Sequence, residues 1–415
     1  MTPLVRATAL ALSFATPVAA QTTSIDLSEA LQRALDVQPT MVEAQGDVRI
    51  ASADERAAWG AFLPSISTSA GASGTFQPGS FPTNYSLGWN ANLPLFEGFA
   101  RLGNKRAAAA NADAADAGLR GERFQVILTT KQIFYAAAAS DELVRVATAQ
   151  VARAEEQLKV ASENLSAGSA TTSDSLRAMV ELGTARMALI RARAANSAAQ
   201  AALAQQVGMS GLVRAVPGES LPALPDTSTV RTLAMAESPD ILESEATARA
   251  AHARVTVAKS RYYPSLDAGY RDSWAGTESP FSGFDSHASS WFMGLSWTLF
   301  DGFDREAAQV VASVNRDAAD SRAADARRQV DAEVIRQVAL LGAAFEQIDI
   351  ARVNVQAATE DFRVLSERYR LGVATSLDLT TSQENLTSAE VDLIQARFDY
   401  LVARAQLEAL VGKEL

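Results

Sequence analysis

The stretch Arg370–Leu379, RLGVATSLDL, has a weaker copy in Ser166–Ser175, SAGSATTSDS. Both contain Gly-x-Ala-Thr, and in both an Asp follows the Gly by six positions. The two copies lie about half of the 415-residue chain apart. A short motif repeated at that separation indicates that the chain consists of two copies of one structural unit.

Two further pairs of segments keep nearly the same separation. FLPS (Phe62–Ser65) recurs as YYPS (Tyr262–Ser265), and LFEGFAR (Leu95–Arg101) recurs as LFDGFDR (Leu299–Arg305). Between the copies, VPGESLPALPD contains three prolines, which is typical of a linker. We therefore predict a first repeat over residues 21–212, a Pro-rich linker over 213–226 and a second repeat over 227–415. Within each repeat we expect a helix, a β-hairpin (65–96 and 265–300) and a long helical hairpin (100–208 and 304–411).

The chain begins with the pattern of a secretory signal. Arg6 precedes an apolar run from Ala7 to Ala15, and small residues at Val18 and Ala20 precede Gln21. We expect residues 1–20 to be a signal peptide. Beyond them no run of about 18 apolar residues occurs, so no transmembrane helix is predicted.

Composition excludes several function classes. The chain has no Cys, which rules out disulfides, thiolate metal sites and Cys nucleophiles. A formal net charge of -11 argues against nucleic acid as a partner. No phosphate-binding loop and no His-Glu-x-x-His motif occurs. The two histidines are isolated, His252 on a predicted helix and His287 in a predicted hairpin loop. We expect no enzyme, no cofactor and no metal site.

The proline-free tracts carry an apolar repeat of seven residues, which is typical of packed helices in a left-handed supercoil. Gly372 is expected to end the first long helix of the second copy. Thr375 or Ser376 is expected to cap the returning helix. At 1.5 Å per residue, each copy would form a rod of about 100 Å with a turn at one end. In the first copy the repeat runs through Val144, Val151, Leu158 and Leu165, and then Leu182 and Leu189. In the second copy it runs through Val334, Leu341, Ile348, Val355, Phe362 and Tyr369.

The segments before the long helices alternate between apolar and polar residues. The pattern is clear in Tyr85–Leu95 and in Trp291–Leu299. Alternation over about 9–11 residues with aromatic residues near the ends is typical of outer-membrane strands. The alternative is a half-buried sheet of a soluble protein. Four strands cannot close a barrel, and an open edge is not viable in lipid, so membrane strands would require several chains to share one barrel.

Taken in order, the export signal, the tandem repeat, Pro-Ser before a strand, LF(E/D)GF after the next strand and the Gly-containing helical turn resemble the TolC-type outer membrane efflux proteins. The resemblance covers the chain from about Asp26 to Gly412. It implies an α+β fold in a homotrimer, in which four strands per chain contribute to a shared 12-stranded barrel in outer membrane lipid. The long antiparallel helices would form an α-barrel through the periplasm.

The resemblance also implies a function and partners. The trimer would be the exit duct of an efflux pump or a type I secretion system, joined by a periplasmic adaptor protein to an inner-membrane transporter. By position, Gly168, Thr171, Gly372 and Thr375 would form the periplasmic tips that contact the adaptor.

Three residues match gate or latch positions of the family. Asp174 and Asp378 match carboxylates of the returning helices, and Tyr369 matches a latch tyrosine with Asp174 as its acceptor. Thr381 stands where some members have a second Asp, and Ala374 where some have a latch Arg. These departures imply a single acidic ring and a weaker latch. An Asp in the first helical turn also interacts favourably with the helix dipole, which explains both aspartates without a gate.

Two other functions compete with the duct. A soluble, exported coiled-coil scaffold would use its helical hairpins to bind partners but leaves the alternating strands unexplained. An exported enzyme lacks a catalytic constellation.

Overall fold

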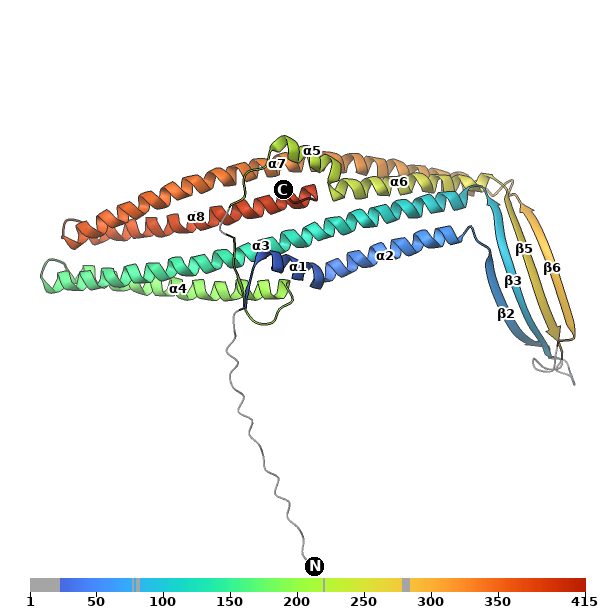
Figure 1. Cartoon of the computed structure of the whole chain (residues 1–415), viewed down its shortest axis with the longest axis horizontal. Helices are drawn as coiled ribbons and strands as arrows, with labels where there is room; N and C mark the ends of the chain where they lie inside the picture. The colour runs from blue at the N-terminus through green and yellow to red at the C-terminus, as the bar shows by residue number, and fades with distance from the viewer. Residues whose placement is uncertain (1–22, 77, 80–82, 219–220, 278–283) are drawn as a thin grey trace, which may run out of the picture. The chain divides into compact units, whose positions relative to one another are not determined.

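The computed structural model describes residues 23–76, 78–79, 83–218, 221–277 and 284–415. The predicted signal peptide, residues 1–20, lies outside these ranges. One order of elements runs twice along the chain (Figure 1). In the first half it comprises α1 (Leu27–Val37), α2 (Pro39–Gly60), β2 (Ser65–Gly74), β3 (Thr83–Glu97), α3 (Ala100–Ser166) and α4 (Thr172–Gln206). In the second half it comprises α5 (Thr227–Glu237), α6 (Pro239–Lys259), β5 (Ser265–Gly276), β6 (Ser286–Ser296), α7 (Asp304–Arg370) and α8 (Ser376–Val411).

The fold is mostly helical with an antiparallel sheet, as the sequence predicts. Three short elements complete it: β1 (Thr23–Ile25), β4 (Val213–Ala215) and the 3-10 helix η1 (Ser260–Tyr262). None of the helices within the described ranges is both long enough and apolar enough to cross a membrane.

The chain divides into two compact units, and each combines segments from both halves. Among the described residues, the turn unit comprises 23–38, 129–222 and 344–402. The sheet unit comprises residues 39–128, 223–343 and 403–415. The two compact units therefore reflect packing between the halves of the chain, whereas the two predicted repeats reflect the order of elements along the chain.

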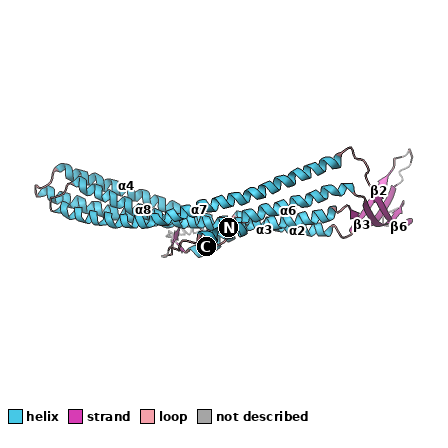
Figure 2. Cartoon of the chain, turned by 90° about the horizontal axis from the view of Figure 1, so that it is seen from above, coloured by secondary structure: helices cyan, strands magenta, loops and turns pink. Residues whose placement is uncertain are grey.

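The sheet unit contains a four-stranded antiparallel sheet in the order β2-β3-β5-β6 (Figure 1). Its strands lie beside the ends of α2 and α6 (Figure 2). Two hairpins are predicted, and in the structure they are joined through β3 and β5, where Tyr85 pairs with Gly276. The β3–β5 register shifts between Pro94 and Phe96. Pro94 has no backbone N–H and therefore cannot donate a hydrogen bond to the ladder. Among the described residues, β2 and β6 have no strand on their outer sides.

Tight corners connect the sheet to the long helices. Gly98 and Phe99 have φ values of 60° and 71°, and Gly302 and Phe303 have values of 70° and 73°. A Cβ at residue 98 would collide with the carbonyl oxygen of Ser260. Gly98 is therefore required both for its backbone conformation and for close packing.

The core of the turn unit lies where the short strands β1 and β4 pair in parallel against α3, α4 and α8. Buried residues there include Ile25, Phe134, Leu203, Val213 and Phe398. Neither strand was predicted from the sequence, because three residues are too few for a periodic pattern. Strand β4 occupies the start of the segment predicted as a linker.

The predicted seven-residue repeat is buried unevenly in both halves. In the second half Val334, Leu341 and Ile348 are at most 2% exposed, as a packed helical seam requires, whereas Val355 and Phe362 are half-buried. In the α3–α4 contact of the first half, Ala154 and Ala185 are fully buried and the predicted seam residue Leu182 is 8% exposed. The predicted seam residues Val151 and Leu158 pack around them half-buried. Two alanines and one leucine thus form the centre of this contact.

Candidate functional site

The turn between α3 and α4 is held by local hydrogen bonds. Gly168 has a φ of 75°, and the N–H of Ser169 donates to the carbonyl of Asn164 at 2.9 Å, which ends α3. Thr171 Oγ1 accepts from the N–H of Asp174 at 3.3 Å, and the Asp174 carboxylate accepts from the N–H of Thr171 at 3.0 Å. This reciprocal pair is a capping box that begins α4.

The turn between α7 and α8 repeats this geometry. Gly372 has a φ of 74°. The Asp378 carboxylate accepts from the N–H of Thr375 at 3.1 Å, and the N–H of Asp378 donates to Thr375 Oγ1 at 3.2 Å. The predicted end of the first helix at Gly372 is confirmed. Of the two predicted caps, Thr375 is the residue that caps α8.

Hydrogen bonds to the carboxylates lower the pKa values of both aspartates. The pKa of Asp174 is lowered first by the backbone N–H of Thr171, then by the hydroxyls of Thr171 and Ser376. The pKa of Asp378 is lowered by the hydroxyl and the N–H of Thr375. Both groups are therefore charged at neutral pH and act first as helix caps.

Ser376 links the two turns. Its hydroxyl donates to Asp174 Oδ1 at 3.0 Å and accepts from Arg177 Nη1 at 3.2 Å. Ser376 is only 6% exposed, so this contact lies inside the turn unit. From the sequence, Ser376 was predicted only as a possible cap of the returning helix, and no role was predicted for Arg177.

The hydrogen bond predicted between Tyr369 and Asp174 is absent from the structure. Tyr369 is 7% exposed and its Oη has no hydrogen-bond partner among the described residues. Asp174 is already engaged, because Oδ2 accepts from Thr171 and Oδ1 accepts from Ser376. Burial and the charge of Asp174 raise the pKa of Tyr369, so its phenol stays neutral.

A second pair of carboxylates lies beyond the caps. Burial raises the pKa of Glu181 on α4, and the charge of Glu384 on α8 raises it further. Thr381, which stands at the position of the second family Asp, is exposed on α8. Neither Glu181 nor Glu384 stands out in the sequence, because glutamates are common on helix faces.

One face of the sheet is apolar. The register places Ile66, Ala91, Tyr270 and Trp291 in one row across the four strands. Ile66 is 72% exposed and Trp291 is 77% exposed, although both are large and apolar. An exposed apolar surface of this kind is typical of contact with lipid or protein.

The other face of the sheet is polar. Its matching row contains Ser67, Asn90, Arg271 and Ser290. Residues one position apart along a strand point to opposite faces, so the alternation of the sequence produces both faces. A sheet with one apolar and one hydrophilic face is suited to a wall between lipid and water.

Comparison with protein families decides the identity. The family model for outer membrane efflux proteins matches residues 30–209 and 230–413, most of the chain. The chain belongs to the outer membrane efflux protein family. The predicted family, the location in the outer membrane and the efflux-channel function are thereby confirmed.

Relatives of this efflux protein cover most of its length. It is 26% identical over 404 residues to the outer membrane efflux protein BepC of Brucella suis, covering 93% of this chain and 85% of BepC. It is 25% identical over 329 residues to the alkaline protease secretion protein AprF of Pseudomonas aeruginosa, covering 77% and 68% of the two chains. The names of these relatives describe efflux and secretion rather than enzymes.

Solved structures show the same fold at low identity. The outer membrane protein VceC of Vibrio cholerae superimposes with a TM-score of 0.81 at 18% identity, covering 93% of this chain and 96% of VceC. The CmeC outer membrane channel of Campylobacter jejuni also gives 0.81, at 17% identity, covering 93% and 85%. The helical and sheet architecture of the efflux protein is therefore that of known channels.

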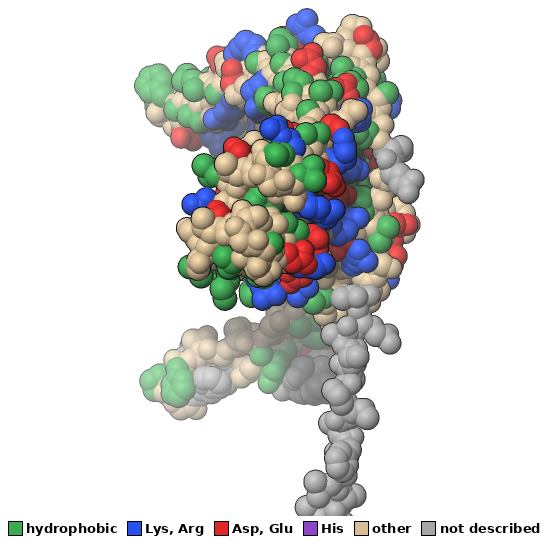
Figure 3. All heavy atoms as spheres, turned by 90° about the vertical axis from the view of Figure 1, so that its left-hand side faces the viewer, with side chains coloured by type: hydrophobic (Ala, Val, Ile, Leu, Met, Phe, Trp, Pro, Cys, Tyr) green, Lys and Arg blue, Asp and Glu red, His purple; other side chains and the backbone are tan. Residues whose placement is uncertain are grey.

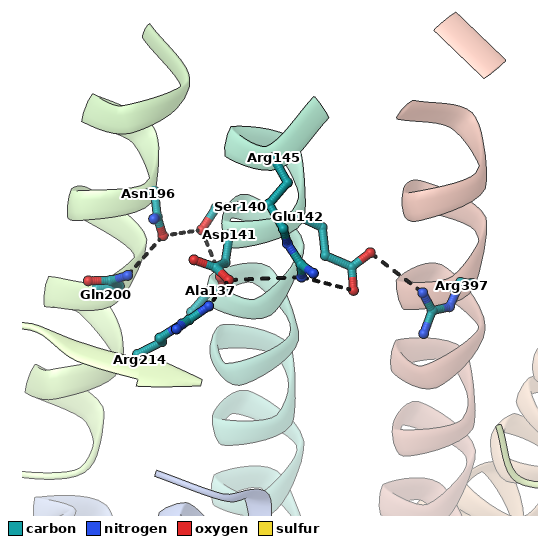
Figure 4. Close-up of polar contacts among 9 residues, drawn as sticks. All are labelled: Ala137, Ser140, Asp141, Glu142, Arg145, Asn196, Gln200, Arg214 and Arg397. Carbon is teal, nitrogen blue, oxygen red and sulfur yellow. Dashed lines mark hydrogen bonds and ion pairs between the residues drawn. The ribbon is translucent and has the colours of Figure 1, made fainter. Parts of the chain in front are cut away.

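Polar contacts tie α3 of the efflux protein to its neighbours near β4 (Figure 4). Asp141 accepts from Arg214 of β4 at 2.7 Å. On the next residue, the carboxylate of Glu142 lies 3.5 Å from Arg397 of α8. Ser140 donates to Asn196 of α4 at 3.0 Å. Consecutive residues of α3 thus contact β4, α8 and α4.

The surface around the turns carries charges of both signs. In the view that faces the turns, acidic and basic side chains are interspersed (Figure 3). Arg186 pairs with Glu155 at 2.9 Å, and Arg370 lies 3.8 Å from Glu156. These exposed pairs balance the surface charge but contribute little stability each.

The two histidines each pair with one carboxylate. His252 lies on α6, as predicted, 2.9 Å from Asp320. His287 was predicted in a loop but lies in β6, 2.6 Å from Asp272 of β5. The prediction was wrong because the strand extends further toward the turn than the apolar alternation does. In the part of the chain that the structure describes, no cluster of His, Asp and Glu has the arrangement of a metal site.

Proposed function

We propose that three copies of this chain form a channel in which the sheet units combine into one 12-stranded barrel in the outer membrane. The helical turns would form the periplasmic end of the duct. There they would contact an adaptor protein that joins the channel to an inner-membrane transporter, in efflux or in type I secretion.

The open edges of the sheet carry this proposal. Strands β2 and β6 have no outer partners within the described chain, although β2 pairs with β3 over ten positions and β6 with β5 over eleven. Unpaired backbone groups at such an edge are not viable in lipid. Pairing β6 of one copy with β2 of the next satisfies both edges and closes a barrel.

The two faces of the sheet support the same arrangement. The exposed row of Ile66 and Trp291 would face lipid, and the row with Asn90 and Arg271 would face the water-filled lumen. A hydrophilic lumen is suited to polar cargo.

The turns support the periplasmic role. Gly168, Thr171, Gly372 and Thr375 build two exposed turns of equal geometry, which three copies would present six times. Asp174 and Ser376 would form the latch between neighbouring hairpins, and Asp378 would form an acidic ring. Tyr369 would contribute to the latch through burial of its side chain rather than through a hydrogen bond to Asp174.

Cysteine cross-linking tests the shared barrel, and the chain has no native Cys to interfere. Ser69→Cys on β2 is combined in separate variants with Cys at positions 288, 290 or 292 of β6. At least one combination is expected to give trimers linked by disulfides in outer-membrane fractions. Ser86→Cys on β3 with Ser290→Cys is the control, because β3 is separated from every β6 by another strand. Monomers in all three combinations would contradict the shared barrel.

A further inference from the structure

The polar face of the sheet is lined almost entirely by small side chains. Pro94 and Glu97 lie on this face at the end that leads into the helices. Elsewhere on this face of the described strands, every residue is serine, asparagine, glycine or alanine, except for three. These three are Asp267, Arg271 and Phe292. A cation and an aromatic ring therefore stand out from a wall of small side chains.

Arg271 is a cation without a partner. It is the only lysine or arginine in the four strands of this sheet, and its side chain is exposed. Its guanidinium makes no hydrogen bond or ion pair with the described residues. Asp272 points to the opposite face, where it pairs with His287 at 2.6 Å. Asp267 shares the face of Arg271 but lies four residues, or about 14 Å, along the strand. The donors of Arg271 are therefore free for another molecule.

Phe292 lies over Gly269, its partner on the neighbouring strand. A Cβ at residue 269 would come within 2.4 Å of the Phe292 ring, so the ring occupies the space above this glycine on the polar face. Packing over Gly269 buries part of the side chain, and Phe292 is still 41% exposed. The interior of a membrane barrel is normally polar, so an exposed aromatic ring departs from the pattern.

The two side chains lie close enough to contact one ligand. Gly269, which the ring covers, precedes Arg271 by two residues, or about 7 Å along the strand. Asn90 is the partner of Arg271 on β3. The hydroxyl of Ser67 donates to Asn90 Oδ1 at 2.5 Å, so the Nδ2 of Asn90 can donate elsewhere. An aromatic ring stacked on Phe292 would bring an attached carboxylate beside Arg271 and Asn90.

We propose that Arg271 and Phe292 form a binding site for small aromatic molecules that carry a carboxylate. The guanidinium offers two parallel N–H donors to the carboxylate, and the ring of Phe292 offers offset stacking. Every residue of the site belongs to one chain, so binding itself does not need a neighbouring copy.

The role of the site rests on the proposed channel, in which the polar face lines the lumen and three copies place three sites at one height. Twelve strands spaced by about 4.8 Å and tilted by about 40° enclose a backbone circle about 24 Å in diameter. Its radius is close to the Debye length of about 10 Å at 0.1 M salt, so the three arginines attract an anion across the opening. Exposed sites bind weakly, which suits a duct because its cargo has to leave again.

Binding is tested by fluorine NMR on the purified full-length protein in a neutral detergent, with para-fluorobenzoate as the probe. Broadening of its resonance is expected to give a Kd in the millimolar range. The amide para-fluorobenzamide keeps the ring without the charge, and fluoroacetate keeps the carboxylate without the ring. Each is expected to bind at least about fivefold more weakly. Equal affinity for para-fluorobenzoate and either of the other two probes would overturn the site.

Matched variants locate the effect. Arg271→Gln is expected to raise the Kd of para-fluorobenzoate about tenfold, and Phe292→Leu about threefold. Arg191→Gln removes an exposed arginine of α4, and Trp291→Leu removes the neighbouring aromatic residue on the apolar face. Both of these controls are expected to keep the Kd of the unmodified protein. An unchanged Kd in Arg271→Gln, or the same increase in Trp291→Leu as in Phe292→Leu, would overturn the assignment.

The position of the site in the lumen has a separate readout. In planar bilayers, para-fluorobenzoate on the extracellular side is expected to lower the single-channel current of the unmodified protein and of Arg191→Gln, but not that of Arg271→Gln. Binding in detergent without an effect on the current would overturn the position in the lumen. Monomers in every cross-linked combination would instead contradict the proposed trimer, while the NMR experiment still decides whether the site exists.

Discussion

The two helical turns have the same local structure but different tertiary roles. Each has a glycine at a φ near 75° and a capping box of Thr and Asp. Asp174 has a second contact, because its Oδ1 accepts from Ser376 of the other hairpin. The carboxylate of Asp378 accepts only from Thr375 within the described chain. Duplication thus preserved the cap, whereas packing between the hairpins recruited only the first aspartate.

The largest effect is expected from a contact between the halves. Arg153 and Glu390 are 17% and 25% exposed, and they connect α3 to α8 at 3.1 Å. Arg153→Met leaves Glu390 without its partner, so we expect a loss of about 2 kcal/mol in the free energy of unfolding. Urea denaturation followed by circular dichroism measures it. Arg186→Met removes an exposed pair within one hairpin and should cost no more than about 0.5 kcal/mol. Equal losses in Arg153→Met and Arg186→Met would mean that this contact between the halves stabilises the fold no more than an exposed pair within one hairpin.

Replacing each turn glycine with alanine tests whether the two helical turns have the same local structure. Gly168→Ala and Gly372→Ala each place a Cβ on a left-handed backbone, which costs about 1–2 kcal/mol. No atom lies within 4 Å of the added Cβ at either position, so the two losses should be equal. The same denaturation experiment measures both. A clear difference would show that one turn is stabilised by its neighbours and not by backbone conformation alone.

Ser376→Ala tests the tertiary difference between the turns. It removes the hydrogen bond to Asp174 but leaves both capping boxes, so we expect a loss of about 1 kcal/mol. A double-mutant cycle with Asp174→Asn should show coupling, whereas a cycle with Asp378→Asn should show none. If Asp174 and Ser376 form the latch, Ser376→Ala also raises single-channel conductance.

Tyr369→Phe is expected to have a smaller effect. Because Tyr369 Oη has no partner in the described chain, its removal should change the free energy of unfolding by less than about 0.5 kcal/mol. Single-channel conductance should stay unchanged. A conductance as high as that of Ser376→Ala would restore a direct role for Tyr369 in the latch.

The pH dependence should distinguish the two capping aspartates from the half-buried Glu181. The lowered pKa values of Asp174 and Asp378 give stability that is present above the ordinary Asp pKa of 3.8 and is lost as pH falls below it. The raised pKa of Glu181 has the opposite sign, so its contribution is present below the ordinary Glu pKa of 4.5 and is lost as pH rises. Glu181→Gln should therefore raise Tm at pH 7 but not at pH 4. An equal change at both pH values would contradict the assigned ionisation.

Local patterns predicted much of the fold and part of the candidate site. The start of α8 at Ser376 and its end at Val411 follow from a turn motif and a helical period, both of which involve neighbouring residues. The alternation of Tyr85–Leu95 predicted β3 because side chains of a strand point to opposite faces regardless of what pairs with it. The roles of Gly372 and Thr375 in the turn were predictable for the same reason.

Contacts between distant segments were not predictable. The pairing of β1 with β4 involves three residues in each strand, too few for a pattern. The partner of Asp174 was predicted as Tyr369 but is Ser376, because both lie near the turn and only the packed structure decides which hydroxyl reaches the carboxylate. The unpaired atoms of Gln157 and Gln383 were not predicted either, since their burial depends on the packing of two helices that are far apart in the chain.

From its sequence alone, this protein is an exported, duplicated chain with long helices, capped turns and two-faced strands. Backbone conformation and the spacing of apolar residues act over a few residues, and they can be read directly. Tertiary structure decided which aspartate joins the hairpins, and it decided that β2 and β6 have no outer strand within the described chain. These features depend on which surfaces meet after folding, and a one-dimensional pattern does not specify that geometry.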